Sequence, residues 1–381
     1  MHWLVWVLVW CSAVDLALAT NYSICQEWTG SDFYSHFYWW SWNDPTKGKV
    51  DYVTQKDSQK SNLSFVDPKT GRFVLAVDTG DPVPLNGNFS DMGRRSNRIH
   101  SNHLYGDGFY ILKATKVPTG CATWPAFWTS TKEPWPQGGE IDVIEGVNGK
   151  GPNLASLHTD NGCTLNTNVS QVQTGHLDRT NCSYQPGCAS TFKEPDTFGD
   201  DLNKRGGGYF VLMRDTTLNG LGISVYFWGA DEDPSKLPEA IGAAPQKAPT
   251  FLNSDDIQHW GKPEVFFGSN YGPNSSCDWS KYMSLHEIIF DTTLCGTWDN
   301  GAFSDDGCSG VSCQDYLVNN GEKFADARWE IDYLRIYSNG CEYEPDGKKS
   351  KGGANAVRPT LWLSIMSMLV FMLALYGQGM L

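Results

Sequence analysis

Short runs with strand-like composition recur along this chain, and several of them alternate apolar and polar residues. Between the runs, Gly, Pro, Asn and Asp return too often for long helices to form. Alternation with a period of two is typical of half-buried strands. The runs lie at residues 72–79, 108–117, 208–216, 222–229, 284–292 and 329–337. Strands separated by turn-rich loops predict an all-β sandwich or jelly roll, which we expect to span residues 20–341 as one domain.

An apolar segment at residues 3–14 opens the chain and is followed by Ala17-Leu18-Ala19. These are features of a secretory signal peptide, so we expect residues 1–19 to be removed after Ala19. The segment departs from the usual pattern because only His2, and no Lys or Arg, precedes it. A buried hydrophobic helix is the alternative.

The other end of the chain has small residues at 352–356, a short spacer and a second apolar segment at 361–376. This is the pattern of a GPI-attachment signal. We therefore expect a lipid at Gly353 or Asn355, removal of residues 357–381, and anchorage at the outer face of the cell membrane or in the cell wall. A transmembrane helix is the alternative, but the segment is short against the ~20 residues that a bilayer requires. Residues 342–356 are polar and read as a linker.

Once Cys11 leaves with the signal peptide, an even number of cysteines remains: Cys25, Cys121, Cys163, Cys182, Cys188, Cys277, Cys295, Cys308, Cys313 and Cys341. In a secreted chain this predicts disulfides, whose pairing the sequence does not give. The spacing of Cys308 and Cys313 would suit half a metal site, but no second pair with histidines matches it, so we expect no metal. N-x-[ST] sequons predict glycosylated surface loops at Asn21, Asn62, Asn88, Asn168, Asn181 and Asn274.

The composition restricts the class of partner. A formal net charge of −14 would repel a polyphosphate, so we expect no nucleic-acid binding. The chain holds 16 Trp, 16 Tyr and 18 Phe, more aromatic residues than core packing requires. Because aromatic rings are the usual platforms for sugar faces, a neutral polysaccharide is a compatible partner. We expect a monomer that uses no cofactor.

Three carboxylates cluster in WPQGGEIDVIEGVN at residues 135–148. Side chains of a strand alternate between its faces, so Glu140 and Asp142 point the same way. Glu145, five positions after Glu140, would lie on the opposite face of a regular strand. One extra residue in a β-bulge near Val143 and Ile144 would return Glu145 to the face of the other two acids.

Retaining glycosidases use two carboxyl groups roughly 5–5.5 Å apart, one as nucleophile and one as acid/base. A neighbouring negative charge helps the acid/base to keep its proton, because it raises the pKa of that group. The middle aspartate can hydrogen-bond the nucleophile and hold its orientation. A solvated acidic strand or a Ca²⁺ site is the alternative, and the spacing alone does not decide between them.

The stretch resembles glycoside hydrolase family 16, in particular the fungal laminarinase type with its pattern G-E-I-D-[IV]-I-E-G. Further similar segments cover about 25–340: RRSNRI (94–99), GCATWPAFW (120–128), SLHTDNGCT (156–164), SNYGPNSSCDW (269–279), HEIIFDTTLCG (286–296) and WEIDYLRIY (329–337). The resemblance implies a concanavalin-like β-jelly-roll with an open cleft and endo-hydrolysis of β-1,3- or mixed β-1,3-1,4-glucan. It also implies Glu140 as nucleophile, Glu145 as acid/base and Asp142 as assistant to the nucleophile.

Further binding residues are predicted with the help of the same resemblance. Trp128, Trp135 and Trp124 are candidates for stacking on sugars, although each could belong to the core. His158 is similar to a family histidine near the nucleophile, but a lone histidine is more often structural. Arg98 could donate hydrogen bonds to sugar hydroxyls or form a salt bridge with an acid of the cleft.

One departure from the family pattern is CGTWDNG at residues 295–301, where a CGDWAG-like turn is common, so the role of Trp298 stays open. Two rival functions remain. A cell-wall transglycosylase would use the same covalent intermediate, but its motif is usually the shorter E-x-D-x-E. A glucan-binding lectin on the same scaffold would lack the glutamates, and both Glu140 and Glu145 are present.

Overall fold

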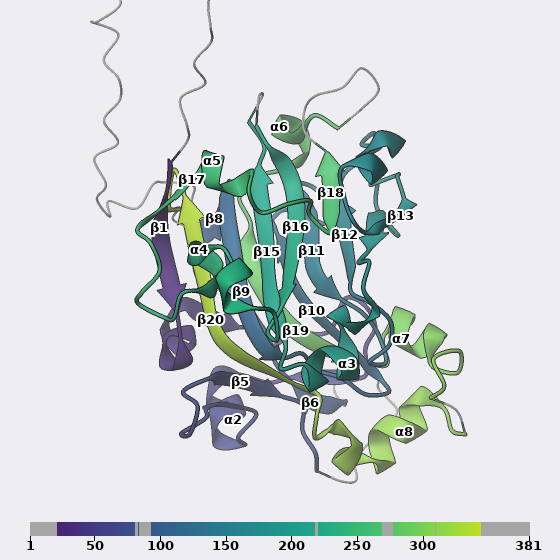
Figure 1. Ribbon diagram of the computed structural model, residues 1–381. Coiled ribbons are helices and arrows are strands. Elements are labelled where there is room, and N and C mark those ends of the chain that lie inside the picture. Colours follow the sequence, from purple (N-terminus) through teal and green to yellow (C-terminus); the bar gives the residue numbers. More distant parts are fainter. Residues whose placement is uncertain are drawn as a thin grey trace, which may run out of the picture. The chain divides into compact units, whose positions relative to one another are not determined.

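The computed structural model describes residues 21–80, 83, 93–217, 220–268, 277–308 and 310–343. At the centre of these residues, two β-sheets pack face to face (Figure 1). The predicted signal peptide, the lipidation residues Gly353 and Asn355 and the apolar tail lie outside the described residues. Glu342 and Tyr343, the first residues of the predicted linker, form the last strand, β21 (Glu342–Tyr343).

The first sheet has nine strands. Its main path runs β17 (Phe251–Asn253), β1 (Asn21–Trp28), β20 (Arg328–Ser338), β9 (Gly108–Lys116), β15 (Gly208–Asp215), β16 (Gly222–Gly229) and β18 (Val265–Gly268). Off this path, β5 (Phe73–Ala76) pairs with β20, and β4 (Ser64–Val66) pairs with β5.

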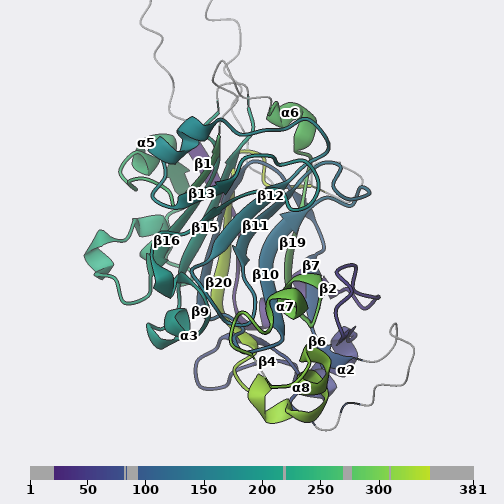
Figure 2. The same cartoon turned by 90° about the vertical axis from the view of Figure 1, so that its right-hand side faces the viewer.

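The second sheet has eight strands, which follow one another across Figure 2. Their order is β13 (His176–Arg179), β14 (Cys188–Thr191), β12 (Leu154–His158), β11 (Glu140–Glu145), β10 (Thr123–Ser130), β19 (Glu287–Leu294), β7 (Arg98–Ser101) and β2 (Phe37–Trp39). In addition, β21 pairs with β8 (Leu104–Tyr105), and β3 (Val50–Tyr52) lies parallel to β6 (Arg94–Ser96). All six predicted strand runs contain a strand, which confirms the all-β expectation.

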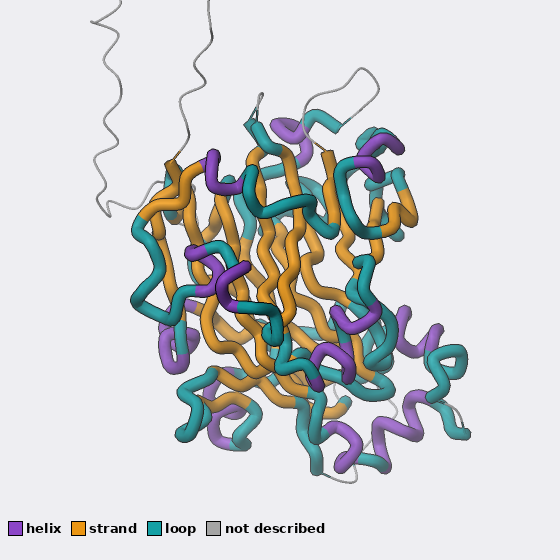
Figure 3. The backbone as a smooth tube through the Cα atoms, in the orientation of Figure 1, coloured by secondary structure: helices purple, strands orange, loops and turns teal. Residues whose placement is uncertain are grey.

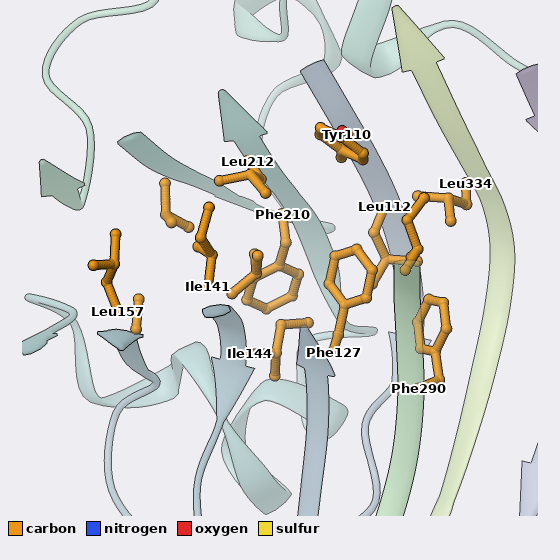
Figure 4. Packing of buried hydrophobic residues seen from close by; sticks show 14 of the residues in the cluster. Tyr110, Leu112, Phe127, Ile141, Ile144, Leu157, Phe210, Leu212, Phe290 and Leu334 are labelled. Atoms are coloured by element: carbon orange, nitrogen blue, oxygen red, sulfur yellow. The ribbon is translucent and has the colours of Figure 1, made fainter. Parts of the chain in front are cut away.

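The main core fills the space between the two sheets. Phe127, Ile141 and Leu157 of the eight-stranded sheet face Leu112 and Phe210 of the nine-stranded sheet (Figure 4). All five side chains have 0% of their surface exposed. Burial of a large apolar side chain contributes about 1.5–3 kcal/mol, so these alternating inward residues hold the sheets together.

Helices are short and lie around the strands (Figure 3). They are α1 (Phe33–His36), α2 (Gln55–Lys60), α3 (Gly199–Lys204), α4 (Glu239–Gly242), α5 (Ser254–Ile257), α6 (Trp279–Tyr282), α7 (Thr297–Ala302) and α8 (Cys313–Asn319). The longest in the described part, α8, has 7 residues, which confirms the expected lack of long helices. Within the same part of the chain, no helix has the length and apolar character needed to cross a bilayer.

The ten cysteines of the described residues form five disulfides, as expected: Cys25 with Cys341, Cys121 with Cys308, Cys163 with Cys277, Cys182 with Cys188, and Cys295 with Cys313. Several close long loops and thereby restrict the unfolded chain. Four sequon asparagines are exposed, namely Asn21, Asn62, Asn168 and Asn181. Asn88 and Asn274 lie outside the described residues.

Candidate active site

The predicted β-bulge is present in β11. Phe127 of β10 pairs with Ile144 and the next residue, Trp128, pairs with Asp142, so Val143 is the extra residue. Val143 and Ile144 both point into the core with 0% of their surface exposed. Because two successive residues face inward, Glu145 returns to the outer face with Glu140 and Asp142. The bulge prediction is confirmed.

A buried asparagine holds the bulge in place. A bulge leaves backbone groups without strand partners, and such groups are costly to bury unpaired. The side-chain amide of Asn153 donates to the carbonyl of Val143 at 2.8 Å, and its oxygen accepts from the Glu145 N–H at 3.1 Å. Asn153 is fully buried. We did not predict this residue from the sequence, because nothing in the residues around Asn153 indicates a contact with the bulge.

Each glutamate accepts a hydrogen bond from a tryptophan. Trp135 Nε1 donates to Glu140 Oε2 at 3.1 Å, and Trp124 Nε1 donates to Glu145 Oε1 at 2.9 Å. Trp135 is 44% exposed, so its ring face is open to a ligand. Trp124 is half-buried, and its ring lies edge-on to Trp298 at 5.5 Å between centroids. Two of the three predicted tryptophans therefore contact a predicted catalytic acid.

The loop that carries Trp135 ends at Gly138 and Gly139, whose φ angles of 77° and 88° favour glycine. A Cβ on Gly139 would also approach within 2.5 Å of Met283. Buried His286 donates from Nε2 to the carbonyl of Gly138 at 2.8 Å. The loop is thus attached at its end to the strand region of β19, two strands away in the sheet from β11.

His158 lies beside two of the acids. Its Nε2 is 3.3 Å from Asp142 Oδ2 and 3.9 Å from Glu140 Oε1, while its Nδ1 donates to the carbonyl of Tyr184 at 2.9 Å. Burial opposes the charged ring, but the hydrogen bond and charge of Asp142, together with Glu140, raise the pKa of His158 to about 10. A positively charged imidazolium therefore connects Asp142 and Glu140, where a direct hydrogen bond between the acids was expected.

Burial raises the pKa of both glutamates, and the charge of Asp142 raises it further. The pKa of Glu140 rises to about 8, against the opposing effects of His158, Arg98 and the Trp135 N–H. The pKa of Glu145 lies well above its ordinary value for the same two reasons, with the Trp124 N–H opposing. Glu145 can therefore hold a proton at neutral pH, as a general acid must. His158, Arg98 and the Trp135 N–H, in contrast, favour the charged form of Glu140 that a nucleophile needs. Because the groups interact, their titration belongs to the cluster as a whole.

Arg98 lies on the same outer face, on β7. Its Nη1 is 3.7 Å from Asp291 Oδ2, and its guanidinium carbon is 4.3 Å from the ring centroid of Trp40 and 5.0 Å from that of Trp128. Burial raises the pKa of Asp291 to about 7, although Arg98 opposes the rise. Of the two predicted roles, the structure shows the salt bridge with an acid of this face. A hydrogen bond from Arg98 to sugar stays a prediction.

A second polar network next to Arg98 was missed from the sequence. Arg98 Nε donates to His100 Nε2, and His100 Nδ1 donates to Glu287 Oε2, each at 2.9 Å. Glu287 also accepts from Tyr38 at 3.0 Å and pairs with Lys132 at 3.0 Å. Burial lowers the pKa of His100 to about 4, so the ring is neutral. One indication of this network was present in the sequence: Glu287 and Asp291 lie four residues apart in a predicted strand, which places both acids on the same face.

Two groups of residues have the spacing of a metal site within the described part of the chain. Ligand atoms of Glu140, Asp142 and His158 lie within 4.8 Å of one another, as do those of Cys163, Cys182 and Cys277. The three cysteines are all in disulfides, so they offer no thiolate to a metal. At the other group, Asp142 favours the protonated ring of His158, whereas a metal ligand needs the neutral ring.

Comparison with known proteins gives consistent matches. A family profile described as "XgeA-like, catalytic GH16 domain" matches residues 37–337. A probable glycosidase of Schizosaccharomyces pombe is 35% identical over 326 residues, which cover 84% of this chain and 70% of that protein. Endo-1,3(4)-β-glucanase xgeA of Emericella nidulans is 30% identical over 87% of this chain and 50% of its own length. The chain thus spans about half the length of this relative.

Two solved structures also share the fold. Laminarinase 16A from Phanerochaete chrysosporium, with 6-O-glucosyl-laminaritriose in both donor and acceptor sites, is 33% identical with a TM-score of 0.74. An elongating GH family 16 β-1,3-glucosyltransferase is 29% identical with a TM-score of 0.71. They match 84% and 83% of this chain and 100% and 99% of their own chains, respectively. The expected jelly-roll sandwich is confirmed.

Proposed function

Because the chain belongs to the XgeA-like catalytic group of glycoside hydrolase family 16, we propose that it cleaves β-1,3-glucan, and mixed β-1,3-1,4-glucan, at internal bonds. The observation that carries this proposal is the bulge at Val143. It brings Glu140 and Glu145 to one face of β11, where each accepts a hydrogen bond from a different tryptophan. The names of the relatives support the substrate class.

The reaction proceeds in two displacements with retention of configuration. The Glu140 carboxylate attacks the anomeric carbon while Glu145 gives its proton to the departing glycosidic oxygen. The resulting glycosyl ester on Glu140 is then cleaved by water, from which Glu145 takes a proton, and the Glu140 carboxylate is released. Asp142 and His158 orient Glu140, since the imidazolium lies next to both acids.

A transglycosylase is the second candidate, which the similarity to the elongating β-1,3-glucosyltransferase supports. It would use the same glycosyl ester, with a sugar hydroxyl in place of water. The hydrolase names of the relatives support hydrolysis as the main reaction. A lectin is the third candidate, and the retention of both glutamates argues against it.

Reducing-end release from laminarin, measured with and without an added oligosaccharide acceptor, tests the proposal. We expect steady release of new reducing ends and little change when the acceptor is present. Longer products without net release would assign the chain to transglycosylation. Binding without any bond cleavage would assign it to the lectins.

We also propose that the mature protein is secreted and held at the cell surface by a GPI lipid at Gly353 or Asn355. The small residues, spacer and apolar tail after residue 351 support this location. Treatment of cells with phosphatidylinositol-specific phospholipase should release the protein. Recovery of residues 361–376 in the mature protein would support a membrane span instead.

A further inference from the structure

Among the described residues, Trp42 is 62% exposed, the largest value for any exposed large apolar side chain. A single exposed apolar residue needs no explanation by itself. Trp42 is different because its ring lies 5.5 Å from that of Trp40, which in turn faces Arg98 of the candidate active site. Its position therefore has to be considered together with the outer face of the eight-stranded sheet.

Trp40 continues the sheet beyond the end of β2. Its backbone N–H donates to the carbonyl of Arg98 at 2.8 Å, which places it in the row that holds Arg98 and Asp291. The guanidinium of Arg98 lies between Trp40 and Trp128, at 4.3 Å and 5.0 Å from their ring centroids. Trp128 pairs directly with Asp142 in the neighbouring strand. The side chains of Trp128, Arg98 and Trp40 thus form a continuous row between the acids of β11 and Trp42.

The loop that presents Trp42 is firmly attached to the same sheet. Asp44 Oδ2 accepts hydrogen bonds from the Gly48 N–H at 2.9 Å and from the Thr293 hydroxyl of β19 at 2.6 Å. A Cβ on Gly48 would come within 2.1 Å of Thr293 Oγ1, so the loop packs closely on β19. The loop is therefore held on the sheet, while the side chain of Trp42, which contacts Trp40, is left largely uncovered by protein. This is the arrangement expected of a binding platform and unlike that of a core residue.

We propose that Trp42, supported by Trp40, forms a distal subsite that stacks on a glucosyl unit of a long β-glucan chain. The inference rests on the proposed function of the acids on β11. From β11 to β2 the sheet crosses four strand spacings, a distance of roughly 19 Å. A glucosyl unit is about as long as one spacing, so a chain must extend roughly four sugars from the acids to reach Trp42. Aromatic rings bury the apolar face of such a sugar while its hydroxyls stay in water.

If this subsite exists, the higher kcat/KM for long oligosaccharides than for short ones depends on Trp42. Trp42→Ala should lower kcat/KM for laminariheptaose about fivefold to tenfold and change kcat/KM for laminaritetraose by less than about twofold, because a tetraose that is being cleaved has at most three sugars on one side of the acids. Trp42→Phe should recover most of the loss, since it keeps a ring. Phe251→Ala is the matched control: Phe251 is 60% exposed but lies on β17 of the other sheet, so both substrates should be unaffected.

Binding measured by calorimetry in a Glu140→Gln background separates this inference from the proposed function. There, Trp42→Ala should weaken the binding of laminariheptaose about fivefold to tenfold and leave that of laminaritriose, which is too short to reach Trp42, unchanged, whether or not the wild-type protein hydrolyses glucan. Equal affinities for laminariheptaose with and without Trp42 would overturn the subsite. An equal loss for both oligosaccharides would also overturn it, because it would indicate a general effect of Trp42 on the site.

Discussion

The outer faces of the two sheets differ sharply, although both are built from the same alternating strands. On the nine-stranded sheet, outward residues such as Phe109, Ile111 and Val211 join a second apolar cluster. Helix α4 lies in front of this sheet in Figure 1. Its Ile241 belongs to the cluster, together with apolar side chains of the segment that follows it. On the eight-stranded sheet, the outward positions near the middle hold acids, histidines and Arg98.

One outer face therefore contributes mainly to stability, and the other holds the candidate active site. The nine-stranded sheet buries apolar side chains on both of its faces, which stabilises the fold. The eight-stranded sheet has such packing on its inner face. The outer face of the eight-stranded sheet holds ionisable groups instead. Burial raises the pKa of Glu140 and lowers that of His100, and it disfavours folding unless partners compensate. Asp142 with His158 and Asp291 with Arg98 are such pairs. Substitutions on the outer face of the eight-stranded sheet should therefore lower activity more than stability. Substitutions on the outer face of the nine-stranded sheet should lower stability more than activity.

The largest effect should follow from removal of a catalytic carboxylate. Glu140→Gln should lower turnover on laminarin about 10³-fold or more, and Glu145→Gln about 10²–10⁴-fold, because they remove the nucleophile and the acid/base respectively. Initial rates of reducing-end release measure both losses. The thermal unfolding midpoint should stay at or above that of the wild type, since each variant removes a buried acidic group from a crowded cluster. Wild-type turnover in Glu140→Gln would contradict the site assignment.

A smaller loss is expected for Asp142→Asn, about 10–100-fold in turnover, since Asp142 orients the site and does not react. The pH–rate profile should change as well. The charge of Asp142 raises the pKa of Glu145, so its removal lowers that pKa and moves the alkaline limb to lower pH. A variant with an unchanged rate and an unchanged profile would show that Asp142 is only a structural strand residue.

The smallest effect on turnover should come from Ile111→Ala, on the outer face of the nine-stranded sheet. Ile111 has 0% of its surface exposed, so its truncation should lower the free energy of unfolding by about 2–5 kcal/mol. Denaturant unfolding measures this loss, and kcat of the folded fraction should equal that of the wild type. A large fall in kcat would show that the two faces are not independent.

Local features of the fold could be predicted from the sequence. Alternation located the six strand runs, and the spacing of Glu140, Asp142 and Glu145 required the bulge that the structure contains. Both inferences depend on side-chain direction within one strand, which is fixed by backbone geometry. The even number of cysteines likewise predicted disulfides, although not which cysteines pair.

Contacts between distant strands could not be predicted in this way. Asn153 fills the bulge from the beginning of the next strand region, and Trp40 meets Arg98 only because β2 pairs with β7. Strand order is set by the packing of the whole sandwich, and one sequence does not reveal it. Only the family resemblance led us to expect His158 near the nucleophile, because its contact with Asp142 and Glu140 depends on the pairing of β12 with β11.

The stereochemistry of the first products tests the central claim, that the bulge of β11 places Glu140 and Glu145 for a double displacement. Proton NMR of laminarin or a laminarioligosaccharide during the first minutes of reaction resolves the two anomers before they equilibrate. Attack by Glu140 and then by water inverts the anomeric carbon twice, so the account predicts that the β-anomer accumulates first. Early accumulation of the α-anomer would mean a single displacement and would contradict it.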